Sequence, residues 1–345
     1  MADRPDSAAQ LPDELDLAIV NALQIHPRAP WSLVGEVLQV DPATASRRWR
    51  RMRSGSQAWV TGFLTNGFTQ ECGAILEINC HPGRVVEVAE TLAADPQAYG
   101  IKLMSGRRDL VALVVARNLE DLSHYLLERP GRLPGVARMG SYLMVGDARA
   151  SSRWRLRNLE PAAAARLSEA ARPRPAPPLA LREVDHALAG ALARDGRLGL
   201  AELAAEIGTS LATARRRMNA LLGSGQLTLR CDMARTLSGW PVTACFWARV
   251  PMDSLAETNK ELAAIPEVRV AFLTAGPQNL YLEAWLRTTS DVVRFEERLT
   301  ARLPRMAVDD RAITLRVIKH SGRILDAAGR CVNTVPPFSA MPQHR

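Results

Sequence analysis

Apolar residues recur every three or four positions along two separate stretches of the chain, with the spacing of an amphipathic helix. The members of the two stripes are Leu15, Ile19 and Leu23, and Val184, Leu188 and Leu192. Both stripes belong to a longer repeat, because residues 14–60 recur without a gap 169 positions later as residues 183–229. A period of this length indicates a duplicated domain and excludes a solenoid, whose repeats are far shorter.

Each copy continues with two further short helices. Apolar residues at helical spacing mark the second helix at Leu33, Val34, Val37 and Leu38, and at Leu200, Leu203, Ala204 and Ile207. Asp41 and Ser210 are the expected N-caps of the third helix, and Pro42 takes a first helical position, where its missing N–H does no harm. The pattern predicts a three-helix unit in each copy.

The third helix of each copy divides into an apolar face and an outward arc. The apolar positions are Ala45, Trp49 and Met52, and Ala214, Met218 and Leu221; for Trp49 and Met52 this spacing favours core packing over base stacking. The outward arcs are Ala43, Thr44, Arg47, Arg50 and Arg51, and Ala212, Thr213, Arg216, Asn219 and Ala220. Small residues followed by arginines suit an element that enters a groove of DNA and then contacts phosphates.

We therefore predict contacts with double-stranded DNA from the third helices, against the alternative of a merely solvated charged face. The predicted residues are Thr44, Arg47, Arg48, Arg50, Arg51, Thr213, Arg215, Arg216, Arg217 and Asn219. Arg47 and Arg216 are the expected base readers, because a bidentate arginine–guanine pair discriminates between bases. Arg48 and Arg217 lie at the edge of the arc and are expected to touch only phosphate.

After each three-helix unit the apolar period becomes that of strands. Strands are expected near 74–79, 100–105, 110–116 and 137–145, then near 242–250, 268–274, 280–286 and 313–319. Helices are expected near 84–93 and 119–128, then near 255–264 and 291–301. The order β-α-β-β-α-β predicts a ferredoxin-like module in each half, and an α+β fold class overall.

The domain boundaries follow from these patterns. We expect helix-turn-helix domains at 12–61 and 181–230, ferredoxin-like domains at 68–146 and 240–320, a linker at 147–180 and a C-terminal tail at 321–345. Within the linker, residues 162–171 suit a short helix, whereas the proline-rich residues 172–178 suit an extended spacer. A DNA contact is the alternative role of this basic segment.

Composition narrows the classes of partner. The chain is 47% hydrophobic and 23% charged, and no apolar run suggests a signal peptide or a membrane span, so we expect a cytosolic protein. Its net charge of +8 favours a polyanionic partner. Five scattered cysteines indicate reduced, mostly buried thiols. Because the sequence shows neither metal-ligand spacing nor a nucleophile motif, we expect no metal, no cofactor and no catalysis.

The Asp-Gly-Arg at 195–197, the Ala-Thr-Ala and Arg-Arg of each third helix and the β-α-β-β-α-β module that follows resemble the Lrp/AsnC family of bacterial transcription regulators. The resemblance occurs once per half and implies two winged-type helix-turn-helix domains alternating with two modules of the dimeric α/β barrel type. It implies a DNA-binding regulator of the bacterial cytoplasm and nucleoid, homo-oligomeric through its ferredoxin-like modules. Because the unit is duplicated in register, we expect the two modules of the chain to pack together as an intramolecular pseudo-dimer. In the first copy residues 26–28, His-Pro-Arg, replace the Asp-Gly-Arg of the family motif. This departure argues against both units recognising the same DNA sequence.

The resemblance also implies an amino-acid-like effector, bound by a loop between the second and third strands of the module. The matching residues are Gly106, Arg107, Arg108, Asp109, Gly276, Gln278 and Asn279. A tight turn is the alternative explanation for these residues. Two alternative functions also stay open: an effector-sensing assembly protein without DNA binding, and a siroheme decarboxylase, an enzyme of similar architecture. The enzymes carry an Arg-His-Arg segment, whereas the corresponding stretches 62–65 and 234–237 lack histidine.

Overall fold

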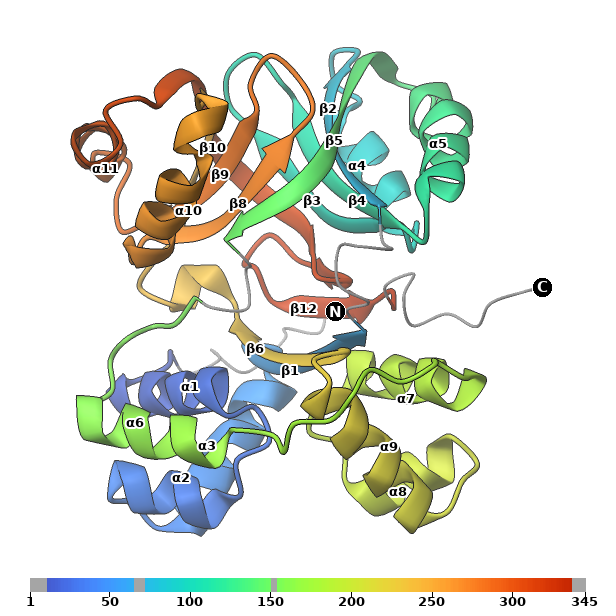
Figure 1. The fold of residues 1–345 in the computed structure, drawn as a ribbon, viewed down its shortest axis with the longest axis vertical. Coiled ribbons are helices and arrows are strands. Elements are labelled where there is room, and N and C mark those ends of the chain that lie inside the picture. The colour runs from blue at the N-terminus through green and yellow to red at the C-terminus, as the bar shows by residue number, and fades with distance from the viewer. Residues whose placement is uncertain (1–10, 65–71, 150–153, 337–345) are drawn as a thin grey trace, which may run out of the picture.

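The computed structural model describes residues 11–64, 72–149 and 154–336. Two three-helix units lie at one end of the molecule and two α/β modules at the other, with a short two-stranded sheet between them (Figure 1). Thr65, within one of the stretches compared with the decarboxylases, and residues 337–345 of the expected tail fall outside the described residues.

The first unit contains the three expected helices, which are α1 (Glu14–Ile25), α2 (Trp31–Leu38) and α3 (Pro42–Ser54). Asp41 caps α3 as predicted, because its carboxylate accepts hydrogen bonds from the amides of Ala43 and Thr44. Trp49 and Met52 are buried with the α1 stripe, which confirms their predicted place in the core.

The second unit repeats this arrangement with α7 (Glu183–Arg194), α8 (Leu200–Glu206) and α9 (Leu211–Gly223). Ser210 caps α9 by accepting a hydrogen bond from the amide of Thr213, as predicted. Its core forms around Leu188, Leu192 and Leu221, all fully buried. The sequence repeat is therefore a repeat of structure.

Two strands that the sequence analysis did not predict join the units. They are β1 (Ala58–Leu64) and β6 (Leu227–Met233), which pair antiparallel. The register places Thr61 opposite Arg230, its own equivalent at the 169-residue offset. An approximate two-fold axis therefore passes through this pair and relates the two three-helix units.

Two arginines shared by the copies connect the units reciprocally. Arg28 donates to the carbonyl oxygens of Gly196 and Leu198, both at 2.7 Å. Arg197 donates to those of Pro27 at 2.7 Å and Ala29 at 2.9 Å. The guanidinium of Arg197 also stacks on Trp31, which places this tryptophan at the junction of the units.

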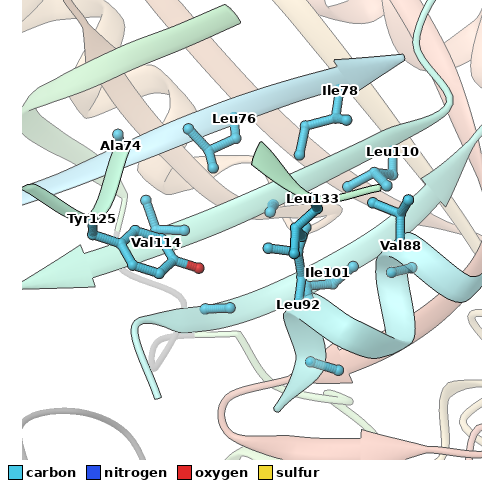
Figure 2. Packing of buried hydrophobic residues seen from close by; sticks show 14 of the residues in the cluster. Ala74, Leu76, Ile78, Val88, Leu92, Ile101, Leu110, Val114, Tyr125 and Leu133 are labelled. Atoms are coloured by element: carbon cyan, nitrogen blue, oxygen red, sulfur yellow. The ribbon is translucent and has the colours of Figure 1, made fainter. Parts of the chain in front are cut away.

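The α/β modules have the expected element order. The first contains β2 (Cys72–Cys80), α4 (Val85–Ala93), β3 (Ala98–Met104), β4 (Leu110–Ala116), α5 (Leu119–Glu128) and β5 (Val136–Arg149). The second contains β7 (Val242–Arg249), α10 (Leu255–Ala264), β8 (Val268–Thr274), β9 (Leu280–Leu286), α11 (Asp291–Arg302) and β10 (Ala307–His320). Figure 2 shows the first core, where Leu76, Ile78 and Leu110 of the sheet meet Val88 and Leu92 of α4.

The last strand of each module crosses to the other module. β5 pairs with β2 and then with β8, whereas β10 pairs with β7 and then with β3. These exchanges close the two sheets into one barrel within the chain. The resemblance assigned such pairing to a second copy, but here the partner sheet is the second half of the same chain, so the modules form the expected pseudo-dimer.

Both crossing strands exceed their predicted lengths. β5 extends to Arg149, into the expected linker, and β10 begins at Ala307, six residues before its predicted start. The first half of β10 includes Asp309, Asp310 and Arg311, and charged residues of this kind hide a strand from a search for apolar alternation. Pairing with the other module forms these extensions.

Parts of the predicted linker and of the predicted tail form regular secondary structure. The linker contains α6 (Pro161–Ala170), close to the predicted helix, and Leu167 of this helix is fully buried in the first three-helix core. The tail begins with β11 (Arg323–Leu325) and β12 (Cys331–Thr334), which extend the sheet beside β10. Short 3-10 turns lie at Pro130–Arg132, Arg235–Leu237 and Met252–Ser254.

We expect Arg197→Met to lower the free energy of unfolding by about 2 kcal/mol, because the partly buried carbonyl oxygens of Pro27 and Ala29 lose a charged donor. Urea titration measures the change. Arg194→Met is the matched control, since Arg194 is largely exposed and pairs with the exposed Glu206; it should change the free energy by less than about 0.5 kcal/mol. Equal effects of the two changes would contradict a role of Arg197 in joining the units.

Candidate nucleic-acid interface

The exposed arcs of α3 and α9 carry most of the predicted DNA-binding residues. Arg47 and Arg50 on α3 are exposed, as are Arg215, Arg216 and Asn219 on α9. Thr44 and Thr213 are half-buried near the helix starts, and Arg47 donates to the Thr44 hydroxyl at 3.3 Å. Within the described residues none of these four arginines forms an ion pair, so their guanidinium groups are free to meet an anionic partner.

The other three predicted arginines have structural partners. Arg48 pairs with Asp13 at 2.6 Å and with Asp16 at 3.2 Å, and Arg51 also pairs with Asp16. Arg217 forms a two-pronged contact with Asp185, its Nε donating at 2.7 Å. Asp16 and Asp185 are fully buried at equivalent positions of α1 and α7.

These contacts correct the prediction for Arg51, which does not belong to the free outward arc. They also give Arg48 and Arg217 a structural role within the protein. Each of the three holds a recognition helix against the first helix of its unit. The Asp13 carboxylate stays ionised more readily, because its hydrogen bond from Arg48 lowers its pKa. Asp16 and Asp185 were not among the predicted functional residues, although they recur at the same position of both copies.

The two recognition surfaces share a plan and differ in detail. In each Arg-Arg pair the first arginine is exposed and the second is bound to a buried aspartate. Farther along the helix, Arg50 of α3 is replaced by Asn219 in α9. The two helices therefore present different side chains in the same frame.

The loop residues predicted to bind an effector have partners within the protein. The Asp109 carboxylate accepts a hydrogen bond from the Cys80 amide at 2.7 Å. Asn279 binds the amide and the carbonyl of Val250, both at 2.8 Å. Asp109 and Asn279 thus cap the end of a neighbouring strand in each module, which matches the alternative of a structural turn.

Arg108 lies inside the barrel rather than in an open loop. It pairs with Glu77 at 2.7 Å and with Asp310 at 2.6 Å, and its guanidinium lies 3.7 Å from the ring centroid of Trp247. The Glu77 and Asp310 contacts outweigh burial and raise the pKa of Arg108. Arg108 is therefore enclosed and has ion-pair partners within the protein, and its role in binding an effector stays a prediction.

The remaining loop residues lie at the surface of the hairpins. Gly106 has a positive φ of 87°, which a glycine adopts without strain, and Arg107 is exposed. Gly276 leaves room for Tyr142, and Gln278 donates to Asp309 at 3.2 Å. The structure thus spreads the predicted effector residues over two hairpins and a barrel interior, and does not gather them into one pocket.

A cavity of about 360 Å³ lies beside α5 in the first module. Its polar lining includes Asp95, Arg117, Asp121 and Arg129. Tyr125 donates a hydrogen bond to Asp95 at 2.9 Å. Burial is the main cause that raises the pKa of the Tyr125 hydroxyl, and the negative charge of Asp95 raises it further. The surface around the cavity therefore carries both signs of charge.

A buried cluster of charges connects β6 to the barrel. Arg230 donates to Asp232 at 2.6 Å and lies 3.1 Å from Nε2 of His320. Arg269 approaches the same carboxylate at 3.4 Å, while its Nε and Nη1 atoms have no hydrogen-bond partner among the described residues. Burial alone would raise the pKa of Asp232, but Arg230 and His320 hold it well below its usual range.

Within the described residues no group of three or more histidine, cysteine, aspartate or glutamate side chains is placed to hold a metal ion.

The five cysteines are free thiols, of which Cys231 and Cys245 are buried and the other three half-buried. None of the helices in the described part of the chain has both the length and the apolar character that crossing a bilayer requires.

We expect Arg217→Ala to lower the free energy of unfolding by about 3 kcal/mol, since it leaves the buried Asp185 without its cation. Arg216→Ala, one residue away on the exposed face, should change it by less than about 0.5 kcal/mol. Chemical denaturation of both variants measures the difference. If Arg216→Ala proved the more destabilising change, the division between bound and free arginines would be wrong.

Acid should destabilise the protein through His320. Burial lowers the pKa of His320 to about 4, although Asp232 partly opposes this shift. Between about pH 6.5 and 4 the unfolded chain therefore takes up a proton that the folded chain excludes, and stability falls as pH falls. We expect a loss on the order of 2 kcal/mol in urea titrations across this window. The loss of stability should be smaller in His320→Asn. If the variant and the unaltered protein showed the same dependence of stability on pH, His320 would not be the cause.

Comparison with known proteins agrees with this architecture. The model of the AsnC-type helix-turn-helix domain matches residues 13–53 and 182–222. The model of the Lrp/AsnC ligand binding domain matches residues 73–151. The chain is 28% identical over 126 residues to an uncharacterized HTH-type transcriptional regulator of Pyrococcus abyssi, covering 36% of this chain and 80% of that protein. It is 25% identical over 148 residues to the HTH-type transcriptional regulator AldR of Mycolicibacterium smegmatis, covering 41% and 85%.

A solved structure extends the similarity to the whole arrangement. The siroheme decarboxylase NirDL matches with a TM-score of 0.57 and 13% identity, covering 93% of this chain and 95% of that one. At this identity the match shows a common fold and no common activity. The matches show that the chain contains two AsnC-type helix-turn-helix domains and an Lrp/AsnC ligand binding domain, within a fold that is duplicated along the chain.

Proposed function

We propose that this protein is a sequence-specific DNA-binding transcriptional regulator that reads DNA with two non-identical recognition helices. The observation that carries the proposal is the pair of exposed arginine arcs on α3 and α9, related by the approximate two-fold axis at Thr61 and Arg230. Free guanidinium groups on a helix that begins with small residues suit both base edges and phosphates. The family match supplies independent support.

The proposed operator is an imperfect palindrome. A two-fold arrangement of recognition helices suits half-sites about one helical turn apart, roughly 34 Å. Because Arg50 is replaced by Asn219, the preferred bases should differ between the half-sites. The family's ligand-binding module supports an amino-acid-like effector as part of the proposal. Such a regulator would act in the bacterial cytoplasm, on the nucleoid.

Selection of bound sequences from random double-stranded DNA, followed by binding titrations, tests the proposal. We expect Arg216→Ala to weaken binding to the selected site by about 5- to 150-fold, the range that corresponds to 1–3 kcal/mol, and to relax the preference at one half-site. Arg47→Ala should do the same at the other half-site. The titrations are repeated with amino acids added, to test the effector.

Two results would contradict this proposal. Unchanged affinity of Arg216→Ala and Arg47→Ala on every sequence would remove the assigned base contacts. Binding that does not weaken as salt rises would exclude a phosphate-contacting mode, because counterion release makes such binding strongly salt-dependent. Perfectly symmetric half-sites would contradict only the non-identity of the two readers.

We further propose that the protein is not an enzyme. This proposal is supported by the stretches 62–65 and 234–237, which lack the histidine that the resemblance to siroheme decarboxylases would require. Siroheme decarboxylase is the activity to test, because the chain shares its fold with such an enzyme. Incubation with siroheme under reducing, anaerobic conditions, followed by mass spectrometry of the tetrapyrrole, should show no loss of carbon dioxide. Formation of a decarboxylated product at catalytic turnover would overturn the proposal.

A further inference from the structure

An extended segment of the linker lies against the second recognition helix. Residues 172–180, here called the strap, run from the end of α6 to the start of the second three-helix unit (Figure 1). The Ala176 amide donates to the carbonyl of Gly223 at 3.2 Å. Gln226 holds Leu179 on both sides, accepting from its amide at 2.7 Å and donating to its carbonyl at 2.8 Å. The strap is therefore fixed in place at the C-terminal end of α9.

The contact falls on the recognition face of α9. At 100° per residue, Gly223 lies in line with Asn219 and Arg216, so the strap continues the exposed arc that begins near the helix start. A Cβ atom on Gly223 would come within 2.2 Å of the Arg174 carbonyl oxygen. Glycine thus permits the close approach. The first copy has Ser54 at the equivalent position, where the side chain is exposed.

The strap adds positive charge to this face. Arg172 and Arg174 are exposed, and neither forms an ion pair within the described part of the chain. Between Glu169 and Glu183 the sequence contains no acid. An extended proline-rich chain has about three residues per turn, and the half-buried Ala176 and Leu179 mark its inner side. Both arginines consequently belong to its outer sides.

We propose that the strap is a second DNA-contacting element, in which Arg172 and Arg174 bind phosphates of the duplex beside the half-site read by α9. This inference rests on the proposed function. Four prolines keep the segment extended before DNA arrives, so little conformational freedom is lost on binding. The contact is one-sided, because the strap packs on α9 and the equivalent end of α3 carries Ser54. The DNA footprint is therefore longer beside the α9 half-site.

The salt dependence of binding to duplex DNA tests the strap. Each phosphate contact contributes about 0.9 to the slope of log K against log salt, so Arg172→Gln combined with Arg174→Gln should make the slope shallower by about 1.8. Base preferences should not change, since phosphate contacts carry no sequence information. Arg166→Gln is the matched control, because Arg166 lies on α6 in the same linker and faces Glu36 at 3.4 Å. Its slope should equal that of the unaltered protein.

A second variant displaces the strap without changing charge. Gly223→Ala should push the Arg174 backbone away and shorten the hydroxyl-radical footprint beside the α9 half-site. Ser54→Ala is its control at the equivalent position of the first copy and should leave the footprint intact. Thermal unfolding by circular dichroism identifies any loss of fold in Gly223→Ala, and the arginine variant decides the question in that case.

The outcomes distinguish a failure of the strap proposal from a failure of the proposed function. If the slope is unchanged in the double variant while Arg216→Ala still weakens binding, the strap is only a spacer and the regulator stands. An equal loss of slope in Arg166→Gln would show a general charge effect and would also overturn the strap contact. If the unaltered protein binds no duplex DNA, both proposals fail together.

Discussion

The antiparallel pairing of β1 with β6 is the constraint on which the rest of the molecule depends. Because Thr61 faces its own equivalent Arg230, the backbone hydrogen bonds of this pair generate the approximate two-fold relation between the units. Arg28 and Arg197 then reach across the axis to carbonyl oxygens of the opposite unit. Donors with charge make strong hydrogen bonds to buried carbonyls, so the distance between the recognition helices is determined by the fold.

A second constraint acts inside each unit. A buried carboxylate is costly unless a cation and hydrogen bonds satisfy it, and Asp16 and Asp185 obtain theirs from the recognition helix. The pairing orients the helix about its own axis. As a result the preceding residues, Arg47 and Arg216, point outward. The same arginine-rich helix therefore serves both stability and recognition, and neighbouring residues have separate roles.

Periodicity alone predicted much of the fold, and its errors have physical causes. The short helices and the central strands of the modules carry dense apolar repeats, and their observed bounds lie within about two residues of those predicted. β1 and β6 were missed because their stability comes from each other rather than from a local pattern. The effector residues were assigned from a loop motif, but Arg108 turns into the barrel, where Glu77, Asp310 and Trp247 surround it.

The duplication, the element order, the caps at Asp41 and Ser210 and the composition of the recognition helices follow from the amino-acid sequence alone, because each depends on residues near one another in the chain. Which arginines are free, where the two halves meet and what the proline-rich linker touches become apparent only in the folded chain. Those properties depend on partners far away in sequence, such as Asp185 for Arg217 and Gly223 for the strap. Burial and pairing between distant segments therefore determine which of the arginines on the recognition helices remain available to a ligand.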